Sequence, residues 1–254
     1  MQNLAYAGGG GLGIVSTAVI LPTYCEAGNI ESLIREIQEL KLDLSIAVID
    51  DSSPDGTPEI VKKLQDEYDN LLLFVRPEKL GLGTAITTGF RSLLRLKNQP
   101  DYIVTMDADY SHNPKDISRL IQVAKRGCDL VIGSRYYNGG KVVGSRLIRR
   151  IISRVANFIA AAIVSTRIHD CTSGFRCYSK NYVKTVLNDL HSQTYEIQIE
   201  TIKQARLHGL VVKEVPITFV DRKLGKSKLT VNEVRGFLTY VFKTTLGILF
   251  HFLK

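Results

Sequence analysis

The chain has 254 residues, of which 44% are hydrophobic and 23% charged, so it is long enough to bury the core of one large globular domain. Its formal net charge of +8 has three common causes, which are nucleic-acid binding, an anionic membrane surface and phosphorylated substrates. The four cysteines contain no C-x-x-C pair. This composition disfavours a metal cluster and a disulfide framework, and we expect reduced thiols.

The first fifteen residues predict a flexible leader. They carry no Lys or Arg and no long apolar stretch, which disfavours a signal peptide. The glycine-rich run 8–13 superficially matches a dinucleotide-binding loop, but such a loop must follow a strand, and no strand pattern precedes this one. We therefore assign residues 1–15 to a leader.

From residue 17 onward, short apolar runs alternate with longer amphipathic stretches, which predicts βα units and a mostly parallel sheet flanked by helices. The fold class is α/β. Two prolines, Pro58 and Pro114, stand near expected helix starts, where a missing N–H costs nothing. Strands are expected over 18–21, 44–49, 71–75, 102–106 and 130–132. Helices are expected over 29–40, 58–68, 84–96 and 114–126.

Two groups of carboxylates follow the second and the fourth strands. Asp50, Asp51 and Asp55 come after the second strand, and Asp107 and Asp109 come after the fourth. Ligands of such sheets bind beyond the carboxyl ends of the strands, so these groups are expected to converge at one edge. The alternative is that the acids cap the following helices, and for Asp55 the two interpretations are balanced.

The sequence Asp107-Ala108-Asp109 is an acidic D-x-D motif at a strand end, with Ser111 as a further oxygen ligand two residues later. Mg²⁺ takes one or two protein carboxylates and completes its shell with waters and substrate phosphates. The motif therefore predicts a divalent-metal site for a nucleotide diphosphate.

Two glycines, Gly81 and Gly83, stand immediately before the third expected helix. Exposed N–H groups at a helix start favour an anion, so this segment is a modest candidate for a phosphate site. The upstream Arg76 and Lys79 would suit a phosphate, or they could equally be solvated surface charges.

Eight motifs in order give the chain a specific resemblance over residues 18–229. They are PTYCE at 22–26, DDSSPDGT at 50–57, KLGLGTA at 79–85, MDADYSHNP at 106–114, GSRY at 133–136, DCTSGFR at 170–176, QIE at 198–200, and EVPITFVDR at 214–222, the last followed by SKL at 227–229. In these motifs the chain resembles the dolichyl-phosphate mannosyltransferases of glycosyltransferase family 2, which have the GT-A fold. Two positions depart from the pattern: Cys25 replaces the usual Asn, and Ser111 stands where some relatives carry a metal-binding Gln.

The resemblance implies roles for individual residues. Those of the nucleotide-sugar site are Pro22, Tyr24, Glu26, Asp50, Asp51, Asp109, Arg135, Arg222 and Lys228. Those of the acceptor phosphate are Arg149, Ser153 and Arg222. The metal ligands are Asp107, Asp109 and Ser111. The groups that act in catalysis are Asp107, Asp109, Arg135 and Arg222.

The same resemblance implies an inverting transfer of mannose from GDP-mannose to dolichyl or polyprenyl phosphate, with Mg²⁺ or Mn²⁺ as the cofactor. A phosphate monoester is already anionic at neutral pH, so the acceptor needs no protein base. Three alternatives stay open at this point. They are a polyprenyl-phosphate glucosyltransferase or other family 2 enzyme that uses a UDP-sugar, a non-catalytic nucleotide-binding subunit, and a nucleic-acid module. The last is disfavoured because no DNA or RNA motif is present.

Two segments predict contact with a membrane. Residues 141–165 form an amphipathic pattern with arginines gathered on one arc, which favours a bound anion over an ordinary solvated face. Residues 236–253 are apolar but interrupted, which is too short a stretch to span a bilayer. We expect a catalytic domain over 16–229 and an interfacial helix over 230–254, which could also dock a small membrane-embedded partner subunit or close the core. The expected location is peripheral, on the cytoplasmic face of a membrane.

Overall fold

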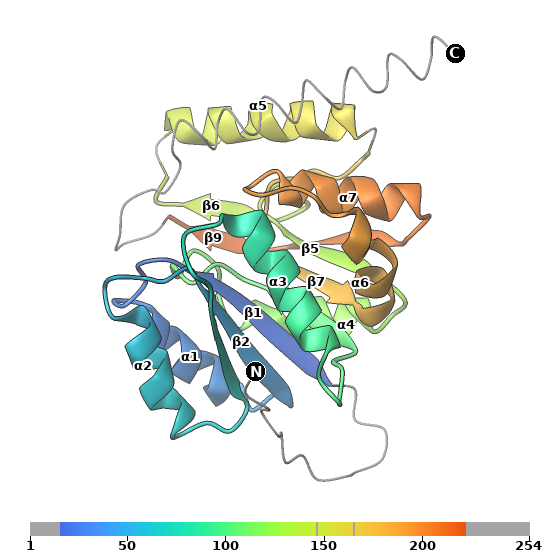
Figure 1. The fold of residues 1–254 in the computed structure, drawn as a ribbon. Coiled ribbons are helices and arrows are strands. Elements are labelled where there is room, and N and C mark those ends of the chain that lie inside the picture. Colours follow the sequence, from blue (N-terminus) through green and yellow to red (C-terminus); the bar gives the residue numbers. More distant parts are fainter. Residues whose placement is uncertain (1–15, 146, 165, 222–254) are drawn as a thin grey trace.

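The structure is a computed structural model that describes residues 16–145, 147–164 and 166–221, apart from the side chains of Arg149 and Ile163 (Figure 1). Its centre is a seven-stranded sheet in the order β3-β2-β1-β4-β7-β5-β8. Every pairing in this sheet is parallel except the two made by β7. The expected α/β class with a mixed, mostly parallel sheet is therefore confirmed. The expected leader and the segment 230–254 lie outside the described residues.

The elements alternate along the chain as the apolar pattern predicts. The strands are β1 (Thr17–Thr23), β2 (Leu44–Asp50), β3 (Leu71–Val75), β4 (Tyr102–Thr105), β5 (Leu130–Ser134), β6 (Lys141–Val143), β7 (Arg176–Ser179), β8 (Val212–Pro216) and β9 (Thr218–Val220). The helices are α1 (Ile30–Glu39), α2 (Thr57–Gln65), α3 (Leu82–Leu94), α4 (Asp116–Ala124), α5 (Leu147–Ile163), α6 (Lys180–Val186), a short 3₁₀ turn (Leu187–Asp189) and α7 (Ile197–Leu207). The five expected strands and four expected helices are present, with ends shifted by a few residues.

Helices cover both faces of the sheet (Figure 1). In β1, Val19 and Leu21 face the core shared with α1, α2 and α4, whereas Ala18 and Ile20 face the core shared with α3, α6 and α7. Because a central strand is buried on both faces, its residues are continuously apolar rather than alternating. Because β2, β1 and β4 are neighbours in the sheet and pair in parallel, their carboxyl ends lie side by side at one edge.

Helix α5 lies across one end of the molecule, away from the central sheet (Figure 1). Its buried residues are Asn157 and Ala160. Its apolar side chains instead face outward, with exposed fractions of 73% for Ile148 and 77% for Phe158. The helix is amphipathic as expected, and its apolar face is the exposed one, whereas the anion expected on its arginine arc stays a prediction. Within the described ranges, no helix combines the length and apolar character needed to cross a bilayer.

Candidate active site

The loops after β1 and β2 are joined by buried hydrogen bonds that build the edge of the sheet. Asp50 is fully buried and accepts hydrogen bonds from Thr23 Oγ1 and Ser53 Oγ, both at 2.7 Å. The Ser53 hydroxyl in turn accepts the backbone N–H of Cys25 at 2.9 Å. The structure thus places Asp50, one of the expected nucleotide-site residues, inside the protein, where its carboxylate holds both loops in position.

Asp51 is also buried, and its partner is Arg76. The Arg76 Nε donates to Asp51 Oδ1 at 2.6 Å, and its Nη1 donates to Thr84 Oγ1 at 2.7 Å. Burial raises the pKa of Asp51, and the hydrogen bond and charge of Arg76 offset only part of that rise. Arg76 is therefore neither a solvated surface charge nor a free phosphate ligand, because it links Asp51 to the start of α3.

The glycines before α3 accommodate a neighbouring loop, and the expected anion site is not formed there. The N–H of Gly83 donates to the carbonyl of Gln193 at 2.9 Å. A Cβ at Gly83 would lie 2.2 Å from the Ser192 carbonyl oxygen, and one at Gly81 would lie 2.5 Å from the Gln193 carbonyl oxygen. Because backbone atoms of residues 192–193 occupy the helix start, the glycines serve close packing instead of phosphate binding.

The remaining expected nucleoside residues follow β1. Pro22 and Tyr24 are partly exposed, and Lys79 Nζ lies 4.7 Å from the centre of the Tyr24 ring, which is a cation–π contact. Glu26 is buried, and its Oε2 accepts a hydrogen bond from Asn29 Nδ2 at 2.9 Å. Cys25 has a φ of 56°, in the left-handed region that Asn tolerates well. This backbone conformation suits the Asn that the resemblance implies at this position.

The expected metal ligands follow β4, the strand next to β1. The Asp107 carboxylate is 37% exposed, and a Cβ at Gly174 would lie 3.1 Å from its Oδ1, so glycine leaves the space that this carboxylate needs. Ser111 Oγ is buried without a hydrogen-bond partner among the described atoms. Asp109 Oδ1 accepts the backbone N–H of Ser111 at 3.1 Å. Two carboxylates with one unpartnered hydroxyl fit a hard cation that takes its other ligands from a substrate.

His112 fills the space behind these carboxylates. Its ring stacks on Phe175 with centroids 5.1 Å apart and meets the ring of Phe219 edge-on at 5.5 Å. Burial lowers the pKa of His112 to about 4, so the imidazole is neutral at physiological pH. Its Nδ1 lies 3.9 Å from Asp107 Oδ2. The rings of His112, Phe175 and Phe219 therefore pack together next to Asp107. The sequence pattern does not indicate this aromatic cluster.

Arg135 follows β5 and is held by Asp170. The Nε of Arg135 donates to Asp170 Oδ2 and its Nη2 donates to Oδ1, both at 2.7 Å, while Asp170 itself is fully buried. Burial lowers the pKa of Arg135, but the charge and hydrogen bonds of Asp170, together with the charges of Tyr136 and Asp107, raise it by more.

A second buried carboxylate fixes Asp170. Glu214 on β8 accepts the backbone N–H of Asp170 with Oε1 and that of His169 with Oε2, both at 3.0 Å. The His169 Nδ1 contacts the same Oε2 at 2.8 Å. Sequence analysis assigned no role to Asp170 or Glu214, although both lie in quoted motifs. Their function follows from contacts between segments about 45 residues apart, and spacing along the chain does not show such contacts.

The expected acceptor residues are only partly described. Ser153 lies on α5, and its Oγ accepts the phenol proton of Tyr136 at 2.8 Å. Arg149 precedes it by one helical turn on α5, but its side chain is outside the described part, as are Arg222 and Lys228 entirely. Thr172 Oγ1 accepts both Arg135 Nη2 and Asn157 Nδ2, at 2.7 and 3.0 Å. Helix α5 is therefore linked through Thr172 to Arg135.

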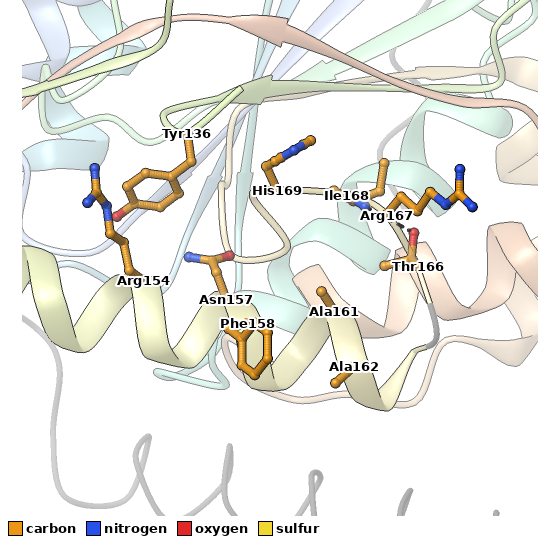
Figure 2. A pocket seen from close by; sticks show the side chains of 10 residues that line it. All are labelled: Tyr136, Arg154, Asn157, Phe158, Ala161, Ala162, Thr166, Arg167, Ile168 and His169. Carbon is orange, nitrogen blue, oxygen red and sulfur yellow. Dashed lines mark hydrogen bonds between the residues drawn. The ribbon is translucent and has the colours of Figure 1, made fainter. Parts of the chain in front are cut away.

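Two grooves adjoin Tyr136. The smaller one, of about 220 Å³, has four lining cations, which are Arg135, Lys141, Arg150 and Arg154. We call it the basic groove. The larger one, of about 490 Å³, runs between α5 and the segment 166–169, and we call it the apolar groove (Figure 2). Tyr136 and Arg154 line both, and none of the described residues that line either groove is acidic.

A mostly parallel sheet with a D-x-D pair after β4 and a partly buried arginine after β5 is the arrangement expected of a glycosyltransferase of the GT-A fold. A family model described as glycosyl transferase family 2 matches residues 18–187, and the chain belongs to this family.

Curated relatives agree with this assignment. The chain is 37% identical over 221 residues to polyprenol monophosphomannose synthase of Mycolicibacterium smegmatis, covering 86% of this chain and 83% of that protein. It is 36% identical over 213 residues to undecaprenyl-phosphate mannosyltransferase of Micrococcus luteus, covering 83% and 86%. Among solved structures, glucosyl-3-phosphoglycerate synthase from Mycobacterium tuberculosis in complex with Mn²⁺, UDP and glucosyl-3-phosphoglycerate shares the fold, with a TM-score of 0.65 at 18% identity over 92% of this chain and 80% of that one.

Proposed function

We propose that this glycosyltransferase moves mannose from GDP-mannose to a polyprenyl phosphate with inversion at the anomeric carbon. The single observation that carries the proposal is the pair of grooves at Tyr136, because a groove with four lining cations provides for a phosphate acceptor. The names of the two curated relatives, both of which describe mannosyl transfer to a prenyl phosphate, support the same substrates.

Asp107 and Asp109 are proposed to hold a divalent cation, Mg²⁺ or Mn²⁺, with Ser111 as an added oxygen ligand. When bound, such an ion acts as a Lewis acid on the nucleotide diphosphate. Arg135 presents its charge to phosphate oxygens while Asp170 fixes its plane. A donor diphosphate that approaches an acceptor phosphate requires cations. This chain supplies them from the segment after β5, from β6 and from α5.

The acceptor supplies its own nucleophile. The second pKa of a phosphate monoester lies near 6, so one oxygen carries a full negative charge at neutral pH. The protein then needs to position the oxygen and neutralise repulsion, and no side chain has to remove a proton. The role of Arg135 and the cations of the basic groove is therefore electrostatic.

The proposal is tested by a transfer assay with the purified full chain, labelled GDP-mannose or UDP-glucose, and a long-chain prenyl phosphate. We expect a labelled prenyl-phosphate-mannose product from GDP-mannose and a much slower reaction, or none, from UDP-glucose. Rapid transfer from UDP-glucose alone would replace the mannosyl proposal by a glucosyl one. Failure with both donors, while GDP-mannose still binds, would favour a non-catalytic nucleotide-binding subunit.

We also propose that the outward apolar face of α5 rests on an anionic membrane surface. Ile148 and Ile152 are 73% and 64% exposed on this face. Burying one such side chain contributes about 1.5–3 kcal/mol, so Ile148→Asp should weaken binding to vesicles that contain anionic phospholipid by about tenfold or more. Leu207→Asp is the matched control, because Leu207 is 67% exposed on α7 and is not part of the outward apolar face of α5. Cosedimentation measures both variants, and an equal loss in the two would contradict the orientation.

A further inference from the structure

His112 carries a polar atom that makes no hydrogen bond in the fold. Its side chain is buried, and its Nδ1 has no hydrogen-bond partner among the described atoms. A buried polar group without a partner destabilises a folded protein, so such groups are rare. The Oγ of the adjacent Ser111 is buried and unpartnered in the same way. Two such groups directly after the D-x-D pair need a physical explanation.

The nearest charged group to this atom belongs to an expected metal ligand. The Nδ1 of His112 lies 3.9 Å from Asp107 Oδ2. A hydrogen bond from a ring N–H to a carboxylate is about 2.8 Å long, so the two atoms are about 1 Å too far apart to be bonded. The Asp107 side chain is partly exposed and has room to turn, whereas the His112 ring is enclosed. A small rotation of Asp107 would therefore close the gap.

The ring of His112 is held in place by the aromatic cluster. Phe175 stacks on one face, and Phe219 meets the ring edge-on. The loop before the ring is constrained as well, since Tyr110 has a φ of 59°, in the left-handed region that bulky residues rarely adopt. Such a conformation persists only where the surrounding structure fixes it. The packing therefore keeps Nδ1 next to Asp107.

We propose that His112 is a positioning residue for Asp107 and donates its Nδ1–H to Oδ2 when the carboxylate takes a divalent cation. The proposal rests on the metal role in the proposed function, which it deepens by assigning a residue behind the ligands. A carboxylate that gives one oxygen to a cation keeps the other as an acceptor, and an N–H donor there fixes its orientation. Loss of such a partner typically lowers metal affinity by about 10–100-fold.

Two substitutions at this position separate the hydrogen-bond donor from the packing of the ring. His112→Phe keeps a ring between Phe175 and Phe219 but has no N–H. His112→Asn loses the ring, but its amide nitrogen is bonded to Cγ as Nδ1 is, so it keeps a donor at nearly the same place. Calorimetry on the full chain with saturating GDP, corrected for Mn²⁺ binding to GDP alone, gives the Kd of Mn²⁺. We expect this Kd to rise about tenfold in His112→Phe and about twofold or less in His112→Asn.

Thermal unfolding without metal should rank the two variants in the opposite order. His112→Phe should be at least as stable as the unchanged chain, because it removes a buried polar atom that has no partner. His112→Asn should unfold at a lower temperature, because it leaves a cavity in the aromatic cluster. A residue that served packing alone would instead lose metal affinity and stability together.

The dependence of transfer on metal concentration gives a further measurement. The Mn²⁺ concentration for half-maximal rate should rise about tenfold in His112→Phe, while the rate at saturating Mn²⁺ falls by less. Unchanged Mn²⁺ affinity in His112→Phe would overturn the proposal, and so would an equal loss in both variants. If the unchanged chain binds no Mn²⁺ in the presence of GDP, the metal site and this proposal fail together. If Mn²⁺ binds with the expected differences but no mannose is transferred, the role of His112 stands and the proposed reaction is rejected.

Discussion

Replacing Asp109 by Asn should lower the rate of mannose transfer by about 10²-fold or more, the scale of losing one preorganised electrostatic contact. An amide oxygen carries no full charge, so it is a poor ligand for a hard cation in a site with only two protein carboxylates. Among the described residues, no group of three or more His, Cys, Asp or Glu side chains is arranged to hold a metal ion. Rate measurements with saturating GDP-mannose would show the loss of activity. Calorimetric titration of Mn²⁺ in the presence of GDP would show the accompanying loss of metal affinity.

Asp101→Asn is the control for this change. Asp101 precedes β4 and binds Lys180 at 2.6 Å, whereas Asp109 follows the carboxyl end of the same strand. The control variant should keep its activity and Mn²⁺ affinity, since it alters a partly exposed ion pair far from the carboxyl edge. Full activity of the unchanged chain in excess EDTA would refute the metal role.

The sequence predicts the parallel half of the fold because each buried strand there is a continuous apolar run. It does not predict β7, which begins at Arg176 and inserts antiparallel between β4 and β5. Arg176 is fully buried and donates to the carbonyls of Cys171, Ser173 and Gln198. A buried arginine is stable only with such partners, and they come from two other segments. The local sequence of β7, R-C-Y-S, therefore predicts an exposed segment and not a buried strand.

The candidate site likewise combines features that the local sequence predicts with features that depend on tertiary contacts. The positions of Asp107 and Asp109 after a strand are predictable, since strand ends and acidic motifs are both local features. The pairing of Asp51 with Arg76 and the packing of residues 192–193 on Gly83 are not, because each depends on two loops that meet only in the folded chain. Likewise, the helical period of α5 indicates an amphipathic helix but does not indicate which face turns outward.

The contacts of Asp170 predict a second large effect. Asp170→Ala should lower kcat/KM for transfer by about 10²-fold, because a guanidinium that loses its bidentate partner shifts, and misplacement of about 1 Å costs about that much. The substitution also leaves the largely buried Arg135 without its counter-charge. Loss of one partner of a buried ion pair destabilises a folded protein by about 3–5 kcal/mol. Thermal unfolding must therefore accompany the kinetics, at a temperature where the variant is folded.

A double-mutant cycle separates positioning from a general loss of structure. If Asp170 acts through Arg135, then Arg135→Ala should be about as slow as Arg135→Ala combined with Asp170→Ala, because the second change has nothing left to position. Removing both partners also removes the uncompensated charge, so the double variant should be more stable than Asp170→Ala alone. Arg135→Lys should not restore the rate, since an ammonium cannot match the two oxygens of Asp170 and still present a planar fork to phosphate. A full further 10²-fold loss on adding Asp170→Ala to Arg135→Ala would show that Asp170 acts independently of the arginine it holds.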